Sequence, residues 1–194
     1  SISGWLGIII SVVLLDFAIY VQHVIFHAIP ALWRLHRVHH ADMDYDVTTG
    51  ARFHPIEIVL SMIIKLAAVT ALGAPAVGVL IFEVVLNAVA MFNHGNISLP
   101  LGVDRRLRLV MVTPDMHRVH HSVHPALTNA NFGFNLPWWD RLMGTYVAQP
   151  IEGHEKMKIG LDQFPDPKEN ATLLGLLKMP FSADSGNQTI NRRG

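Results

Sequence analysis

The stretch His36-Arg37-Val38-His39-His40 returns later in the chain as His117-Arg118-Val119-His120-His121. We call these two His-x-x-His-His stretches the first and second histidine box. Positions i, i+3 and i+4 share one face of a helix, so each box can direct three imidazoles at one point. Imidazole is a common ligand of iron, zinc, copper and nickel. A His-x-x-x-His pair, His23 and His27, and a single His94 add further ligands. Because this is more than one metal needs, the pattern predicts a dinuclear site.

Three long apolar runs surround the boxes. They extend from Trp5 to about Val24, from Ile56 to Leu72 and from Pro75 to Phe92. Charged residues make up 15% of the 194-residue chain, against roughly 25% in an ordinary soluble domain. Each run has about the length that a helix needs to cross a bilayer core. We therefore expect three membrane spans rather than three buried helices of a soluble protein.

The order of spans and histidines predicts that all the histidine groups meet on one side of the membrane. The first span ends at His23 and His27, and the first box follows at once. The second span leaves from His54-Pro55, and the third returns to His94. The second box then follows without another span. We expect an all-α integral-membrane helical bundle whose helical cap carries a dimetal site.

Positive charge gathers on the same side as the boxes, which by the positive-inside rule predicts that the cap is cytoplasmic. The arginines on this side are Arg34, Arg37, Arg52, Arg105, Arg106, Arg108, Arg118 and Arg141. The net charge is zero, so nothing indicates nucleic-acid binding. The chain has no cysteine, which excludes thiolate-ligated iron centres and disulfides.

Three ionisable residues lie within the expected spans. Lys65 lies eleven residues after His54, and Glu83 lies eleven before His94. Their depths are thus similar, so we expect them to form an ion pair, since an isolated charge there is costly. The alternative is that Lys65 snorkels to the surface while the acids are protonated. Asp16 lies seven residues before His23, on the same helical face, where it can orient that ligand.

The remaining histidines are harder to assign. His54 can support the start of a span or join the metal site. His124 can be a metal ligand, a donor that supports a ligand, or a contact to the substrate. The sequence does not decide between these roles for either residue. His154 lies in a charged loop, and we expect it to be exposed to solvent. With nitrogen ligands throughout and no His-Glu-x-x-His, a zinc protease fits poorly and a two-iron centre fits better.

Together these pieces resemble the fatty acid hydroxylase / sterol desaturase superfamily of membrane di-iron oxygenases, and look most like its bacterial sterol-desaturase-like branch. The matching segments are Asp16–His27, Leu32–His40, Arg52–Glu57, Phe92–Asn96, His117–Ser122 and Asn131–Tyr146. The chain differs in one respect from fatty acid hydroxylases proper, which have paired histidines in a third box. Here His94 has no such partner, because the positions four residues before and after it are Ala90 and Ser98.

The resemblance implies that residues 1–160 form a membrane oxygenase domain with a cytosolic cap that holds two iron ions. The ligands it implies are His23, His27, His36, His39, His40, His94, His117, His120 and His121. It further implies O2-dependent hydroxylation or desaturation of a lipid, such as a sterol or a fatty acyl chain. The two electrons would come from a separate donor, such as a cytochrome b5-like protein or a ferredoxin.

Other expectations concern the end of the chain and rival functions. We expect residues 161–194 to form a polar tail, disordered from Ser182 onward. The segment Asn131–Tyr146 is expected to pack over the metal face without a chemical role. The alternatives to an oxygenase are a membrane metallohydrolase acting on lipid headgroups, which would want a carboxylate base, and a non-enzymatic metal-binding membrane protein.

Overall fold

Three long helices dominate the computed structural model, which describes residues 4–182, 186 and 188–190. They are α1 (Trp5–Ala28), α3 (Pro55–Leu72) and α4 (Ala76–Asn93). Each is long and apolar enough, by length and composition, to cross a membrane. The prediction of three spans is confirmed, although α1 continues four residues beyond Val24 and so carries both His23 and His27.

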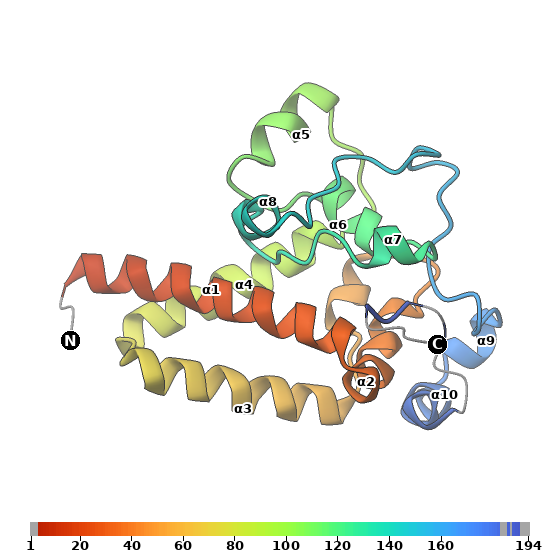
Figure 1. Cartoon of the computed structure of the whole chain (residues 1–194), viewed down its shortest axis with the longest axis horizontal. Coiled ribbons are helices and arrows are strands. Elements are labelled where there is room, and N and C mark those ends of the chain that lie inside the picture. The colour runs from red at the N-terminus through yellow and green to blue at the C-terminus, as the bar shows by residue number, and fades with distance from the viewer. Residues whose placement is uncertain (1–3, 183–185, 187, 191–194) are drawn as a thin grey trace.

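Short helices form a cap at one end of the bundle (Figure 1). The α-helices of the cap are α2 (Pro30–His40), α5 (Leu101–Leu107), α6 (Pro114–His120), α7 (Pro125–Thr128), α8 (Trp138–Met143), α9 (Pro167–Asn170) and α10 (Leu173–Lys178). Two 3-10 helices join them, η1 (Val47–Ala51) and η2 (Met179–Phe181). Helices α2, α3, α6 and α7 carry proline in their first turn, where the missing N–H costs no hydrogen bond. The described residues contain no strand beyond one isolated bridge between Ser122 and Ile159, so the all-α prediction is confirmed.

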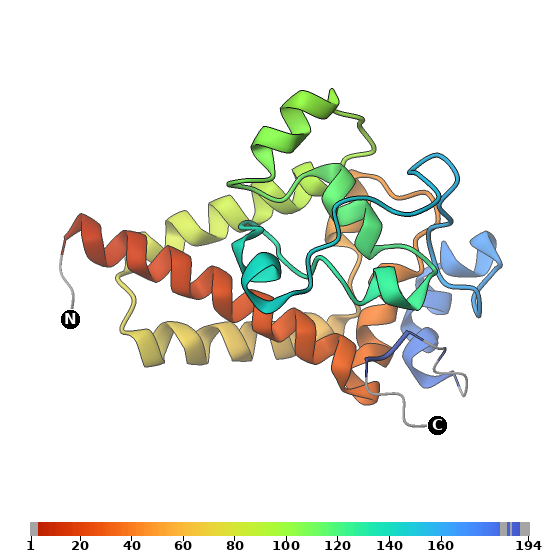
Figure 2. The same cartoon turned by 45° about the horizontal axis from the view of Figure 1, so that its top comes forward.

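Helices α3 and α4 diverge from a tight turn, and α1 packs against both of them (Figures 1 and 2). Gly73 makes the turn possible because it adopts a left-handed conformation with φ 59°. Leu15 and Ile19 of α1 pack with the fully buried Phe82 of α4. Of α3, only Glu57 is fully buried, and most of the other side chains of this apolar helix are exposed, including Val59, Ile63 and Leu66. That pattern suits a helix bathed in lipid.

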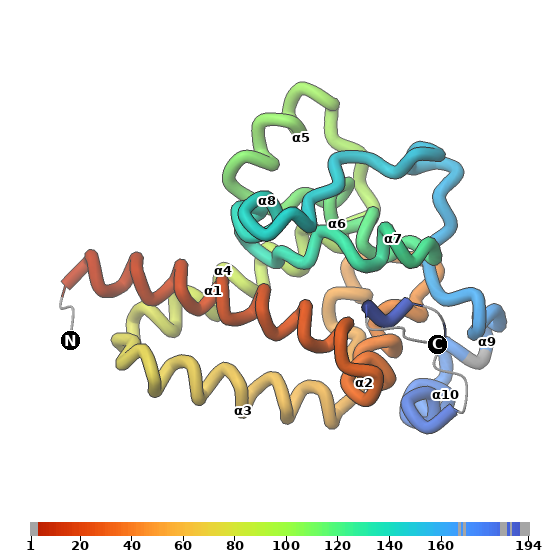
Figure 3. Tube along the Cα trace, in the orientation of Figure 1, coloured from red at the N-terminus to blue at the C-terminus, as the bar shows by residue number. Residues whose placement is uncertain are grey.

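The cap joins the ends of the helices that carry histidines. The C-terminal end of α1, the start of α3 and the end of α4 meet there, and α2 and α6 lie beside them (Figure 3). Leu161 and Met179 pack in one core with Trp33 and Val38 of α2. Part of the 161–194 segment therefore belongs structurally to the cap, while the proposed boundary at residue 160 remains a prediction.

The disorder expected from Ser182 onward falls largely on residues 183–185, 187 and 191–194, which lie outside the described part of the chain. Within the described part, Gln188 and Thr189 are buried. The backbone N–H of Ile190 donates to the carbonyl of His27. These residues pack against the end of α1.

An ion pair links α3 to α4 within the spans, as predicted. Lys65 Nζ lies 2.7 Å from Glu83 Oε1. Removing one charge would leave the other unpaired in an apolar environment, which in protein interiors costs about 3 kcal/mol or more. Removing both avoids this cost.

We therefore expect Lys65→Met to lower the thermal unfolding midpoint of the detergent-purified protein, and Lys65→Met/Glu83→Leu to recover most of the loss. Calorimetry or a thermal-shift assay measures the effect. If the single variant is as stable as the unmodified protein, Lys65 does not depend on Glu83 and the ion pair contributes no stability.

Candidate metal centre

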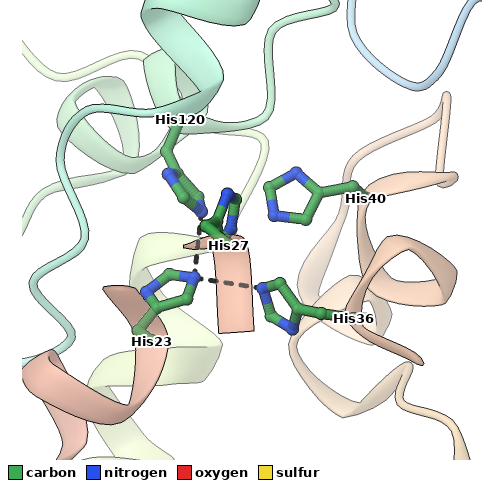
Figure 4. A group of neighbouring side chains, drawn as sticks. All are labelled: His23, His27, His36, His40 and His120. Carbon is green, nitrogen blue, oxygen red and sulfur yellow. Dashed lines mark hydrogen bonds between the residues drawn. The ribbon is translucent and has the colours of Figure 1, made fainter. Parts of the chain in front are cut away.

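Nine histidines converge in two adjoining groups. The first group contains His23, His27, His36, His40 and His120, and the second contains His39, His94, His117 and His121. Within each group, one ring nitrogen from every residue lies within 4.8 Å of the others. All nine are buried. These are the same nine residues that the sequence singled out, brought together from α1, α2, α6 and the end of α4 (Figure 4 shows the first group).

Each histidine box is divided between the two groups, which corrects the expectation that a box directs its three imidazoles at one point. In the first box, His36 and His40 belong to the first group and His39 to the second. The second box is the reverse, with only His120 in the first group. Positions i and i+4 therefore serve one point while i+3 serves the neighbouring one.

The protonation of several rings follows from the partners of their Nδ1 atoms. Carbonyl oxygens of Phe132, Thr49, Ala90 and Ala130 lie 2.7–3.0 Å from Nδ1 of His23, His39, His94 and His120, respectively. A carbonyl oxygen only accepts, so Nδ1 must carry the proton. In these neutral rings Nε2 then keeps a free lone pair.

These lone pairs face one another. His23 Nε2 lies 3.1 Å from His36 Nε2 and 3.0 Å from His120 Nε2 (dashed lines in Figure 4). In the second group, His94 Nε2 lies 3.2 Å from His39 Nε2. With Nδ1 protonated there is no hydrogen to share between two Nε2 atoms, so the contacts are repulsive. A cation placed between the nitrogens removes the repulsion.

The spacing also fits a metal ion. Bonds of about 2.1 Å to nitrogen give a separation of about 3.0 Å between neighbouring ligands of an octahedral ion, and about 3.4 Å for a tetrahedral one. The observed 3.0–3.2 Å lies closer to the octahedral value.

Other nitrogens in the groups are buried without a hydrogen-bond partner among the described residues: His27 Nε2, His117 Nδ1 and both ring nitrogens of His40 and His121. Buried polar atoms are rarely left unpaired. The donor set therefore fits two metal ions.

Burial keeps the cap imidazoles in the form that binds a metal. Loss of hydration lowers the pKa of His39, His40, His117 and His121 well below the ordinary value of 6.5, and repulsion by neighbouring histidines lowers it further. The same burial lowers the pKa of His94 to about 4 and that of His120 to about 3. These rings are neutral at pH 7, so a metal need not displace a proton.

Glu57 supports the first group, a role that the sequence analysis missed. Its Oε1 accepts from His36 Nδ1 at 2.6 Å, and the residue is buried. A carboxylate bonded to the far nitrogen of a ligand histidine fixes the ring and raises its basicity. The available signal was an acidic residue in the first turn of an apolar span, three residues after His54.

Asp16 does not orient His23, contrary to expectation. Its carboxylate instead accepts from Trp139 Nε1 at 2.7 Å and from the backbone N–H of Leu136 at 3.3 Å. The Nδ1 of His23 is already bonded to Phe132 O. Asp16 thus holds the segment that supplies this carbonyl, and its effect on His23 is indirect.

The segment Asn131–Tyr146 orients a histidine, which corrects the view that it packs over the metal face without a chemical role. It provides the Phe132 carbonyl for His23. The two residues before it act in the same way, since the Ala130 carbonyl contacts His120 and Asn129 Oδ1 lies 3.3 Å from His27 Nδ1. The Asp140 carboxylate holds this segment, accepting from the backbone N–H groups of Phe132 and Gly133 and from the Thr145 hydroxyl.

Gly133 is required in this arrangement. A Cβ at this position would lie 2.8 Å from Asp140 Oδ2 and 2.9 Å from Leu136 O. These contacts are too close for any side chain, so the backbone can approach the carboxylate only through glycine.

The remaining histidines lie outside both groups. His54 caps the start of α3, where its Nδ1 accepts from the N–H of Ile56. His124 caps α7 in the same way, accepting from the N–H of Ala126. His154 is half-buried rather than exposed, with Nε2 3.9 Å from Asp115 Oδ2.

A cavity extends from the first group into the spans. His23 and His36 lie at its inner end, and its walls come from α1, α3 and α4. The apolar part of the lining is Ile19, Phe26, Phe53, Ile58, Leu86 and Phe134. This cavity can admit the apolar chain of a lipid between α3 and α4.

Comparisons with known proteins agree with this geometry. The family model described as "Fatty acid hydroxylase" matches residues 8–145. The chain is 29% identical to an ornithine lipid hydroxylase from Rhizobium tropici, and the aligned region covers 96% of the chain and 54% of that enzyme. It is 30% identical to human alkylglycerol monooxygenase, with 82% of the chain matching 32% of that protein. Human cholesterol 25-hydroxylase is 27% identical, with 71% of the chain matching 50% of the enzyme. No solved structure gives a significant match.

The contact between Glu57 and His36 leads to the first prediction for this centre. Glu57→Gln keeps the shape of the side chain but removes the charge that strengthens the histidine. We expect metal affinity to fall roughly tenfold or more, measured as metal retained after dialysis against a graded chelator. Glu152→Gln, on the exposed surface, is the matched control. Equal retention in both variants would show that Glu57 does not support the metal.

The lowered pKa values lead to a second prediction, for the metal-free protein. An unfolded histidine titrates near 6.5, whereas His94 and His120 titrate near 4 and 3 in the folded chain. The unfolded chain therefore takes up protons first as the pH falls. The contribution of these two histidines to the free energy of unfolding is therefore fully present above pH 6.5. It is lost as the pH falls from about 6.5 to 3, at about 1.4 kcal/mol per pKa unit for each group.

We expect the unfolding midpoint of chelator-treated protein to drop as the pH is lowered from 7 to 4.5. Metal-loaded protein should resist this drop, because the metal competes with the protons. A midpoint that stays constant without metal would contradict the burial of neutral histidines.

Proposed function

The chain belongs to the fatty acid hydroxylase family, and on this premise we propose that it is a membrane-bound oxygenase acting on a C–H bond of a lipid. The reaction is hydroxylation or desaturation, and it uses O2 and two external electrons at a two-iron centre. The observation that carries the proposal is the set of buried Nε2 lone pairs that face one another beside a cavity between the spans.

The relatives support a lipid substrate. Their names describe hydroxylation of an ornithine lipid and of cholesterol, and oxygenation of an alkylglycerol. The chain spans about half the length of the ornithine lipid and cholesterol enzymes, and about a third of the alkylglycerol enzyme. The proposal therefore rests on the histidine groups and the cavity of this chain, and the similarities to these enzymes support it.

Five histidines would hold one ion and four the other. Two six-coordinate ions offer about twelve positions, so about three remain for solvent, oxygen or substrate. When bound, the two ions would supply the activation of O2 and the two-electron oxidation that C–H cleavage requires.

The chain's own residues position the substrate and exclude water. His23 and His36 belong to the first metal group and also line the cavity, so a lipid carbon in the cavity meets that group. The aromatic side chains of Phe26, Phe53 and Phe134 surround this end, which keeps the reacting carbon in an apolar environment. Such positioning is the main contribution of a protein to chemistry carried by a cofactor.

A metallohydrolase fits these residues less well. Such an enzyme wants a carboxylate base, whereas both groups consist of histidine alone within the described residues. Of the acids close to the boxes, Asp42 pairs with Arg52 and Asp115 pairs with Arg118. Glu57 Oε1 is bonded to the ligand candidate His36, a position in which it supports that ring rather than a water molecule.

The cap and its metal centre are proposed to face the cytoplasm, because arginine gathers there and the opposite end of the bundle has none. The electrons are proposed to come from a separate donor, such as a cytochrome b5-like protein or a ferredoxin. Both features follow the family resemblance, and the distribution of charge supports the orientation.

Metal analysis of the detergent-purified protein tests the proposal first. We expect about two irons per chain, with metal lost in His39→Ala and His120→Ala, one ligand from each group. His124→Ala is the matched control, because His124 only caps a helix, and it should retain both ions. The loaded protein should consume O2 with a reductant only when an oxidisable lipid is present.

Two zinc ions in place of iron would support the ligand set and contradict the iron assignment. One ion or none, with no effect of either variant, would overturn the dinuclear centre. Two irons without lipid-dependent O2 consumption would leave the centre in place and reject the oxygenase.

A further inference from the structure

Polar side chains follow one wall of the cavity between the spans. Glu57, Ser61 and Lys65 all line it from α3, and their spacing of four residues places them on one face of that helix. Gln22 of α1, next to His23, faces them, and Asn87 lines the cavity from α4. Polar groups within a membrane span are costly and mark functional positions.

The polar groups at the far end of the cavity are satisfied by the protein itself. Lys65 of α3 forms an ion pair with Glu83 of α4. The Asn87 amide nitrogen donates to the backbone carbonyl of Glu83, one turn earlier in α4. This end of the cavity therefore has less capacity left for a ligand.

The polar groups nearer the histidines are only partly satisfied. Gln22 Nε2 donates to Ser61 Oγ at 2.9 Å, which leaves the Ser61 proton available. Gln22 Oε1 is buried and has no hydrogen-bond partner in the part of the chain that the structure describes. The same holds for Glu57 Oε2. A buried acceptor without a partner is expensive, so a donor from a bound ligand would stabilise this end of the cavity.

We propose that Gln22 and Ser61 form a specificity subsite for a lipid that carries a hydroxyl or a secondary amide near the reacting carbon. The ligand donates its O–H or N–H to Gln22 Oε1 and accepts the Ser61 proton. This inference rests on the proposed function, because it names the class of substrate for the same cavity.

The position of the subsite sets where the lipid reacts. Gln22 is adjacent in sequence to His23, and Ser61 lies one helical turn, about 6 Å, from Glu57, which holds His36. A polar group bound here lies close to the first metal group. The carbon presented to His23 and His36 is thus only a few bonds from that polar group, rather than at the far end of a long chain.

The selectivity has a physical basis in the unpaired acceptor. An ester of the same shape cannot donate, so Gln22 Oε1 would stay buried without a partner when the ester binds. Such a loss costs about 1–3 kcal/mol, which corresponds to a preference on the order of tenfold or more. Sites that bind a polar group in this way reject analogues that lack it.

Equilibrium binding of two matched probes tests the subsite. Radiolabelled N-methylhexadecanamide has one N–H, and methyl hexadecanoate replaces it with an ether-type oxygen. Binding is measured to the metal-loaded full chain in lipid nanodiscs, without reductant, so that no turnover is needed. We expect the amide to bind about tenfold tighter or more. Gln22→Leu should bring the ratio close to one. Ser61→Ala should lower it in part, because the Gln22 amide then loses the hydroxyl that holds it in place.

Thr70→Val is the control, because Thr70 lies on the same helix and bonds only to the carbonyl of Leu66 among the described residues. It should keep the full preference. A ratio near one in the unmodified protein, or a ratio that Gln22→Leu leaves unchanged, would overturn the subsite. If Gln22→Leu does not fold, as judged by metal content, Ser61→Ala decides, and an unchanged ratio there would overturn it as well.

This test separates the subsite from the proposed function. Amide preference without any lipid oxidation would support the subsite and reject the oxygenase. Lipid oxidation without a preference between the probes would support the oxygenase and reject the subsite.

Discussion

The mutual orientation of nine buried imidazoles is the constraint on which the rest of this structure depends. Buried nitrogen lone pairs repel one another, and the fold holds them together at separations such as 3.0 Å between His23 and His120. Without a compensating cation this arrangement would cost free energy. A cation placed between the nitrogens would remove this cost, so we expect metal binding to stabilise the cap.

Backbone carbonyls orient four of the nine imidazoles, and an acidic side chain, that of Glu57, orients one. The Nδ1 atoms of these four rings bond to carbonyl oxygens, such as Thr49 O for His39 and Phe132 O for His23. Backbone carbonyls carry no net charge, so they would not offset the positive charge of a bound metal ion. The cost is that loops must be placed accurately, which explains the buried Asp140 that anchors the Phe132 loop.

Sequence reasoning located the site but not its internal order. Spans and histidine groups were predictable because hydrophobic length and helical period are local properties. The Lys65–Glu83 pair was predictable because both residues lie equally deep. Asp16 was assigned wrongly, since the helical face it shares with His23 says nothing about the distant loop that takes its carboxylate. The acidic residue at the start of an apolar span indicated that Glu57 is unusual, but its partner His36 depends on how α2 meets α3, which is a tertiary contact.

The division of each histidine box between two groups has a consequence for the distance between the two points of convergence. Because His36 and His39 are joined by less than one turn of the same helix, yet belong to different groups, a rigid covalent segment links the two points of convergence. The second box provides another such link through His117 and His120. The separation of the two points of convergence is thus tied to the rise of an α-helix, about 1.5 Å per residue.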